Sequence, residues 1–223
     1  ILYMVVPFYN EELVLDETSE RLKAKYEQLI SNDIISPKSR IVYVNDGSKD
    51  KTWEKIKEKH AENSMFSGIN LTRNRGHQNA LLAGLLTVRN LADCVISMDA
   101  DLQDDINAID EMLEKFENDG CDVVYGVRDN RETDTIFKRR TAGAFYKLMQ
   151  GLAQFPEQNL FLRGMVPLVG YKSEIVYYKR GERFAGESKY PLKKMISFAI
   201  DGITSTSAAP MRLIFWIGLI WPL

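Results

Sequence analysis

The sequence has few of the side chains that build disulfide frameworks or thiolate metal sites. Its 223 residues include two cysteines and two histidines, and no metal-ligand spacing links Cys94 and Cys121 to His60 and His77. Each cysteine opens an apolar run, which is typical of a reduced thiol buried in a core. The sequence therefore favours neither a disulfide scaffold nor a metal centre built on cysteine.

The chain also lacks a strong net charge. It has 29 lysines and arginines against 31 aspartates and glutamates, which gives a net charge of -2 and a pI near 5.8. This balance does not attract nucleic acid, so we expect no nucleic-acid partner, and any anionic ligand must be held by local clusters of Lys and Arg. Hydrophobic residues make up 45% of the chain, which is enough for one sizeable core and too much for a disordered chain.

Two common phosphate-binding motifs are missing as well. No G-x-G-x-x-G follows the first apolar run, and no G-x-x-x-x-G-K-[ST] occurs anywhere in the sequence. These absences exclude the dinucleotide fingerprint and the P-loop. Any nucleotide must therefore be bound by other residues.

The sequence does contain alternating strand-like and helix-like segments. Five short apolar runs predict strands at 1–6, 40–45, 67–72, 93–99 and 121–126. Segments with apolar residues at spacings of three and four predict helices at 11–30, 51–62, 78–91 and 106–118. Because the strand candidates are continuously apolar, the pattern predicts an α/β fold, a mostly parallel sheet with helices on both faces.

A polar or glycine-containing cluster follows every predicted strand. These clusters occupy residues 7–12, 45–52, 72–78, 99–105 and 126–132. In an open parallel sheet they would share the carboxyl edge, where ligands bind. Asp, Asn and Ser also cap helices, so "NDGS" at 45–48, taken alone, is equally well explained as a cap. Five clusters on one edge predict a binding site.

The fourth cluster is strongly acidic. Asp99 and Asp101 flank a small alanine, and two neighbouring carboxylates are costly unless a cation lies between them. Their hard oxygens suit Mg²⁺ or Mn²⁺, which typically binds one or two carboxylates together with substrate phosphates. We therefore expect Mg²⁺ or Mn²⁺ bridging a diphosphate. For Asp104 and Asp105 we favour a solvated helix start that complements the helix dipole.

The motifs, taken together, resemble the family 2 glycosyltransferases. "VPFYNEE" (6–12), "VNDGSKDKT" (44–52) and "DAD" (99–101) carry the general resemblance. "LTRNRGHQNALLAG" (71–84), "DADLQDD" (99–105) and "GVR" (126–128) resemble its polyprenyl-phosphate glycosyltransferase branch, which includes bactoprenol glucosyltransferases and relatives of dolichol-phosphate mannose synthase. The resemblance covers essentially the whole chain and implies a GT-A (nucleotide-diphospho-sugar transferase) fold. Family members often follow "DLQ" with a proline-rich turn, which is replaced here by residues 104–106.

The resemblance also implies roles for individual residues. Six would form the nucleoside pocket, with Asp46 bonding the base: Pro7, Tyr9, Glu11, Asp46, Arg73 and Gly76. Asp99 and Asp101 would be the catalytic carboxylates, with Asp99 facing the donor, while Asp101 and Gln103 would hold the metal. Four residues would approach the donor diphosphate or the acceptor phosphate: Arg128, Arg140, Arg183 and Ser188.

The second half of the chain is rich in basic residues and ends in an apolar tail. Basic residues gather at 138–140 and at 179–194, where Lys193 and Lys194 could instead meet anionic lipid headgroups. We expect a glycosyltransferase domain at 1–190, an amphipathic juxtamembrane segment at 191–212 and the start of a truncated transmembrane helix at 213–223. Those last eleven residues are uncharged, whereas a spanning helix needs about 20. A short interfacial or core helix is the alternative.

Within the predicted domain, a family segment with an Asp-x-Arg-like motif is missing where Gly151 runs into Leu152. We therefore expect residues to be absent from the chain there. If so, part of the catalytic constellation is not in the sequence.

Together these features predict an inverting glycosyltransferase at the cell membrane, with its catalytic domain in the cytoplasm and compatible with a homo-oligomer. We expect UDP-glucose as the donor and polyprenyl (undecaprenyl) phosphate as the acceptor. The alternatives are mannose from GDP-mannose, a modified pentose from UDP, or a sugar-hydroxyl acceptor. A processive synthase should show Q-x-x-R-W, which is absent, and the intact acidic pair disfavours a non-catalytic binding protein.

Overall fold

The computed structural model describes residues 1–129, 171–179 and 181. Their elements are β1 (Leu2–Phe8), α1 (Leu15–Ser31), β2 (Arg40–Asn45), α2 (Thr52–Glu62), β3 (Phe66–Asn70), α3 (His77–Val88), β4 (Cys94–Ser97), α4 (Ala108–Asn118), β5 (Val123–Arg128) and β6 (Ser173–Tyr178). The predicted α/β class is confirmed, and each expected helix is present within a few residues of its predicted bounds.

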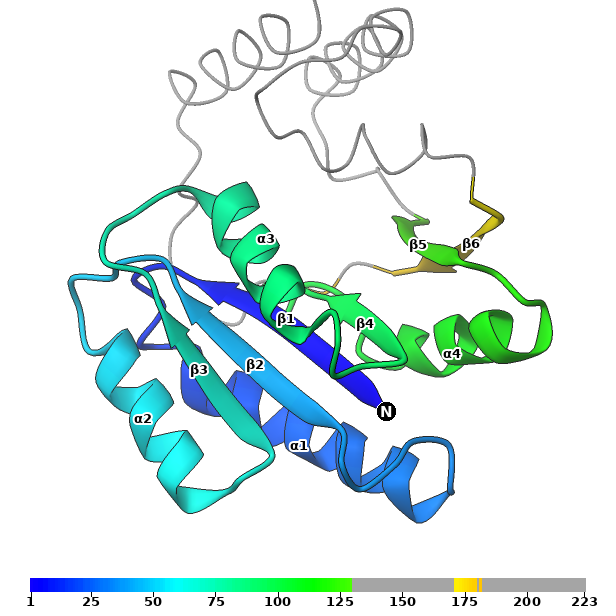
Figure 1. Ribbon diagram of the computed structural model, residues 1–223, viewed down its shortest axis with the longest axis horizontal. Coiled ribbons are helices and arrows are strands. Elements are labelled where there is room, and N and C mark those ends of the chain that lie inside the picture. Colours follow the sequence, from blue (N-terminus) through cyan, green and yellow to red (C-terminus); the bar gives the residue numbers. More distant parts are fainter. Residues whose placement is uncertain (130–170, 180, 182–223) are drawn as a thin grey trace, which may run out of the picture. The chain divides into compact units, whose positions relative to one another are not determined.

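The first four strands form one parallel sheet in the order β3-β2-β1-β4 (Figure 1). The register pairs Phe8 of β1 with Asn45 of β2, and Asn45 in turn with Asn70 of β3. On the other side of β1, Val5 pairs with Ser97, the last residue of β4. The loops that follow these four strands therefore leave from the same edge of the sheet.

Both faces of this sheet are covered, which explains the continuous apolar runs. One face, which includes Met4 and Phe8, packs in a core with residues of α1, α2 and α4. The opposite face carries Val5 and Val44 and packs against α3 (Figure 1). Gly84 of α3 has no room for a side chain, because an added Cβ would collide with both valines. This glycine lets α3 lie close to the sheet.

The prediction that all five strands form one sheet is wrong for the described residues. β5 pairs with β6 in a separate two-stranded sheet, and β6 was not predicted at all. Its run of Ile175, Val176, Tyr177 and Tyr178 is typical of a strand, and it supplies the hydrogen-bonding partner of β5. Arg128 therefore ends a strand outside the four-stranded sheet.

The predicted juxtamembrane segment, 191–212, and the predicted membrane helix, 213–223, lie outside the described residues. No helix within the described part of the chain is long and apolar enough to cross a bilayer. The expected membrane attachment therefore stays a prediction.

Candidate functional site

The loops after β1 and β2 are joined by reciprocal hydrogen bonds. Backbone N–H groups of each loop donate to side chains of the other: Asn10 to Ser48 Oγ (3.0 Å), Glu11 to Thr52 Oγ1 (3.0 Å), Glu12 to Asp50 Oδ2 (3.2 Å), Lys49 to Asn10 Oδ1 (2.8 Å) and Lys51 to Glu12 Oε2 (2.8 Å). These bonds explain why α1 begins at Leu15 rather than at Glu11, as the sequence predicted. Residues 10–12 are engaged with the neighbouring loop.

Asp46 joins the second loop to the third. Its side chain is almost fully buried, at 2% exposure, and accepts hydrogen bonds from the N–H groups of Arg75 (2.6 Å) and Gly76 (2.9 Å). Beside it, Gly47 has φ +63°, and a Cβ there would lie 2.5 Å from the carbonyl carbon of Arg73. A glycine is therefore required for this close approach. Asp46 binds the backbone entering α3 instead of capping the helix that follows its own loop, and its role toward a base stays a prediction.

The other residues predicted for the nucleoside pocket lie on the same sheet edge. Pro7 is buried near the end of β1, and Tyr9 and Glu11 follow it with partly buried side chains. Arg73 is exposed in the third loop, and Gly76, at φ +86°, is the N-cap of α3. The fold thus brings the six predicted residues to one edge.

The acidic turn follows β4. Asp99 lies near the start of α3, with its Oδ1 3.6 Å from Nε2 of His77. Asp101 Oδ1 accepts the N–H of Gln103 at 3.2 Å, and the buried Leu102 between them adopts the left-handed φ of +56°. The His77–Asp99 pair was missed from sequence, although His77 belongs to the third polar cluster. No local pattern predicts this pair, because His77 and Asp99 become neighbours only through the placement of β4 and α3.

The two remaining acidic residues of the turn have different contacts. Asp105 accepts the N–H of Asn107, the N-cap of α4, at 2.9 Å, so it lies just before the helix as predicted, and its effect on the helix dipole stays a prediction. Asp104 accepts a hydrogen bond from the Tyr178 hydroxyl at 2.6 Å. This contact with β6 was not predicted.

The donor atoms of the turn fit the predicted divalent ion. The described residues contain no group of three or more His, Cys, Asp or Glu side chains that could hold a metal on their own. Asp101 and Gln103 instead offer one carboxylate and one amide, with Asp99 nearby. Such a small set of oxygen ligands suits Mg²⁺ or Mn²⁺, whose shell is completed by water and substrate phosphates.

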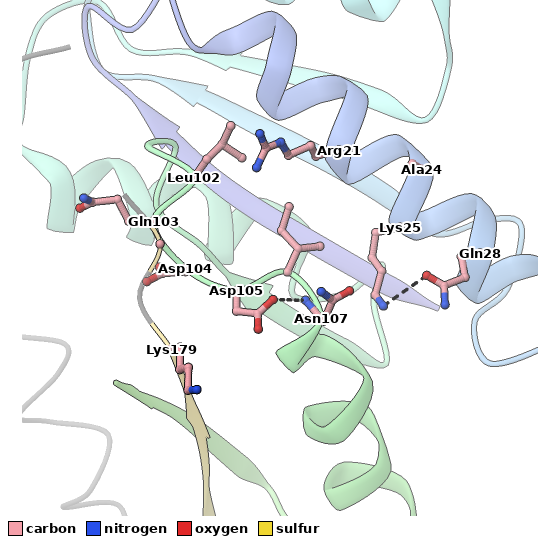
Figure 2. Close-up of a pocket in the computed structure, with 12 residues that line it drawn as sticks. Arg21, Ala24, Lys25, Gln28, Leu102, Gln103, Asp104, Asp105, Asn107 and Lys179 are labelled. Atoms are coloured by element: carbon pink, nitrogen blue, oxygen red, sulfur yellow. Dashed lines mark hydrogen bonds between the residues drawn. The ribbon is translucent and has the colours of Figure 1, made fainter. Parts of the chain in front are cut away.

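A cavity of about 470 Å³ lies between this turn and α1 (Figure 2). One wall is formed by α1 residues Arg21, Ala24, Lys25 and Gln28, and the other by residues 102–107 with Lys179 and Gly181. Lys25 in this wall has a nearly buried side chain, which donates to Asp110 at 2.7 Å and so joins α1 to α4. The turn therefore borders a cavity on its α1 side, while the buried Thr18 hydroxyl of α1 donates to the carbonyl of Ala100 in the same turn at 3.0 Å.

The residues predicted to meet phosphate groups are mostly outside the described part of the chain. Arg128 is the last residue of β5, and Arg140, Arg183 and Ser188 lie outside the described residues. Their roles stay predictions.

The sequence matches the family model described as glycosyl transferase family 2 over residues 3–175. It is 48% identical over 242 residues to an uncharacterized glycosyltransferase of Bacillus subtilis (strain 168), YkoT, with 99% of this chain and 72% of that protein covered. It is 35% identical to a prophage bactoprenol glucosyl transferase homolog of Escherichia coli (strain K12), covering 97% of this chain and 76% of that protein. It is also 35% identical to a bactoprenol glucosyl transferase of Shigella phage SfX, with 97% and 75% covered.

One solved structure supports the fold. Glucosyl-3-phosphoglycerate synthase from Mycobacterium tuberculosis superposes with a TM-score of 0.52 at 16% identity, covering 93% of this chain and 81% of that one. At this identity the likeness concerns the fold alone, which is GT-A-like. With a family match over most of its length, the chain belongs to glycosyl transferase family 2 and is a glycosyltransferase.

Proposed function

We propose that this chain transfers glucose from UDP-glucose to a polyprenyl phosphate, undecaprenyl phosphate, at the cytoplasmic face of a membrane. The observation that carries the proposal is the 35% identity, over 97% of the chain, to proteins named bactoprenol glucosyl transferase. The arrangement of the site supports it, because three polar loops and an acidic turn share one sheet edge, where such folds bind ligands.

The donor would lie across this edge. The interlocked loops after β1 and β2 and the loop held by Asp46 would receive the nucleoside, and Asp99 would face the sugar. Asp101 and Gln103 would hold Mg²⁺ or Mn²⁺. When bound, this ion would supply a Lewis acid for the departing diphosphate.

The acceptor chemistry needs positioning more than proton removal. A phosphate monoester has a second pKa of about 6 and is therefore largely an anionic nucleophile at neutral pH. Its oxygen would attack the anomeric carbon opposite the nucleoside diphosphate, forming a new C–O bond as the old one breaks, with inversion. Arg140, Arg183 and Ser188 would hold the acceptor phosphate and Arg128 would approach the donor phosphates, which offsets the repulsion between two anionic substrates.

The test is transfer of a labelled sugar into lipid. Membranes containing the protein are incubated with labelled UDP-glucose, a UDP-linked modified pentose or GDP-mannose, in parallel with membranes containing the Asp101→Asn variant. We expect label from UDP-glucose in the organic phase for the wild type only. Label from another donor would replace glucose in the proposal, and label appearing solely in an added sugar acceptor would refute transfer to lipid phosphate.

A further inference from the structure

The turn that carries the predicted metal ligands has a strained backbone. Leu102, between Asp101 and Gln103, has φ +56°, a conformation that a bulky residue adopts only where its surroundings enforce it. The Leu102 side chain is buried, at 6% exposure, but the turn borders the cavity on its α1 side. The Thr18 hydroxyl of α1 holds the upstream side of the turn, where it donates to the carbonyl of Ala100 at 3.0 Å, and other contacts hold its downstream side.

Two such contacts come from β6 and the residues just after it. The Tyr178 hydroxyl donates to Asp104 Oδ1 at 2.6 Å across a sequence separation of 74 residues. The N–H of Gly181 donates to the carbonyl of Gln103 at 2.9 Å. These bonds reach the two residues that directly follow Leu102, so they restrain the strained turn from its downstream side.

Tyr178 is itself held by β5. The N–H of Asp129 donates to the Tyr178 carbonyl at 2.8 Å. The tyrosine ring lies against Gly126, where an added Cβ would lie 3.0 Å from Tyr178 Cε1 and 2.8 Å from the terminal methyl of Met112. The absence of a side chain at residue 126 therefore makes room for the ring that directs the hydroxyl at Asp104.

We propose that Tyr178 is a positioning residue, which acts through Asp104 to hold residues 101–103 in the geometry that receives the divalent ion and the donor diphosphate. The inference rests on the proposed function for its role in transfer. Tyr178 itself would touch no reacting atom. Loss of its hydroxyl should therefore weaken metal binding more than it changes the bond-making step.

The first test removes the hydroxyl alone. In the full-length protein, Tyr178→Phe should speed hydrogen exchange of the peptide covering residues 99–106 about tenfold, the scale of losing one hydrogen bond to a carboxylate. Tyr177→Phe is the matched control, because that neighbouring ring is 62% exposed and should leave the exchange unchanged. Equal exchange in wild type and Tyr178→Phe would overturn the proposal.

The second test measures Mn²⁺ itself. Titration of Mn²⁺ in the presence of UDP, followed by electron paramagnetic resonance, should show about tenfold weaker binding in Tyr178→Phe. Combining Tyr178→Phe with Asp104→Ala, which removes the acceptor of the Tyr178 hydroxyl, should add little to either single change, because both remove the same bond. Fully additive losses, or unchanged Mn²⁺ affinity, would refute a positioning role.

Two further measurements guard against general destabilisation and against failure of the proposed function. The thermal midpoint of Tyr178→Phe should stay close to that of Tyr177→Phe, which excludes general destabilisation as the cause of both effects. Excess Mn²⁺ should restore sugar transfer by Tyr178→Phe. If the wild type transfers no sugar to polyprenyl phosphate, the proposed function fails, while hydrogen exchange and Mn²⁺ binding still decide whether Tyr178 positions the turn.

Discussion

The two halves of the proposed donor site are built differently. The loops after β1 and β2 hold each other through several hydrogen bonds between residues 10–12 and 48–52, which are 38 to 41 residues apart in sequence. The acidic turn after β4 contains a strained Leu102, and residues 103 and 104 are tied to β6, far along the chain. The proposed nucleoside side is thus formed by the loops of two neighbouring strands, whereas the proposed phosphate side is held by Thr18 of α1 and also by β6.

Because of this difference, we expect activity to depend more strongly on single substitutions at the phosphate side than at the nucleoside side. Backbone N–H groups held by several carboxylates and hydroxyls give a preformed surface, so single changes there should cost modest free energies. A charged ligand at the phosphate side has no substitute, so changes there should cost far more.

Asp101→Asn should reduce transfer at least about a hundredfold, because it removes a charged ligand from the ion that stabilises the leaving group. Steady-state transfer to polyprenyl phosphate measures this loss. Asp105→Asn is the matched control, since Asp105 accepts the N–H of Asn107 before α4 and should keep nearly full activity. Undiminished turnover in excess chelator would contradict the assignment.

Arg140→Ala or Arg183→Ala should strongly reduce transfer, by about ten- to a hundredfold, because each removes charge-assisted hydrogen bonds to the acceptor phosphate. Lysine at either position should rescue only partly, since it lacks the bidentate fork. Donor affinity and slow donor hydrolysis by water should be nearly unchanged. Transfer to undecaprenyl phosphate and to a short, detergent-soluble prenyl phosphate provides the measurement.

The soluble acceptor separates phosphate binding from membrane attachment. If the two arginines only meet lipid headgroups, both alanine variants should transfer normally to the short prenyl phosphate, and the acceptor assignment would then be wrong. Lys193→Ala is the comparison variant, because headgroup contact is the alternative given for Lys193 and Lys194.

Asp46→Ala should weaken binding of the nucleoside diphosphate about tenfold without changing the anomeric outcome. It leaves the N–H groups of Arg75 and Gly76 without their acceptor, and a lost partner of a buried group costs about 1–3 kcal/mol. Calorimetric titration with UDP measures the change. Ser48→Ala, which removes one acceptor from the interlocked loops, should have a smaller effect, and equal UDP affinity in wild type and Asp46→Ala would remove Asp46 from the donor site.

The sequence predicted that the loops after β1 to β4 share one sheet edge, but it did not predict the contacts of the acidic turn, for a physical reason. Each polar cluster after β1 to β4 can be predicted from the residues that follow an apolar run, and a parallel sheet then places the clusters together. The contacts of Asp104 and Asp99 depend on Tyr178 and His77, whose proximity arises from strand placement that no local pattern specifies. β5 was placed in the wrong sheet for the same reason, because its partner β6 lies about fifty residues further on.

The smallest expected effect concerns the interlocked loops and can be read from pH. Burial alone would raise the pKa of Asp50, but hydrogen bonds from the Thr52 hydroxyl and from the N–H groups of Thr52 and Glu12 outweigh it and hold the pKa below its ordinary value of 3.8. A carboxylate with a lowered pKa stabilises the fold fully above its unfolded pKa, about 3.9, and loses that contribution as pH falls through the lower folded value. Asp50→Asn should therefore lower the free energy of unfolding by about 1 kcal/mol at pH 7, because the amide nitrogen cannot accept the N–H of Glu12 as Oδ2 does, and by progressively less below about pH 4. Urea unfolding of both proteins at pH 7 and pH 3 measures this difference.

The control variant, Glu54→Gln, removes a charge from the first turn of α2, where the helix dipole contributes about 0.3–1 kcal/mol. It should lower the free energy of unfolding at pH 7 by less than Asp50→Asn does. A difference for Asp50→Asn that stays constant down to pH 3 would show that the Asp50 carboxylate does not hold the two loops together.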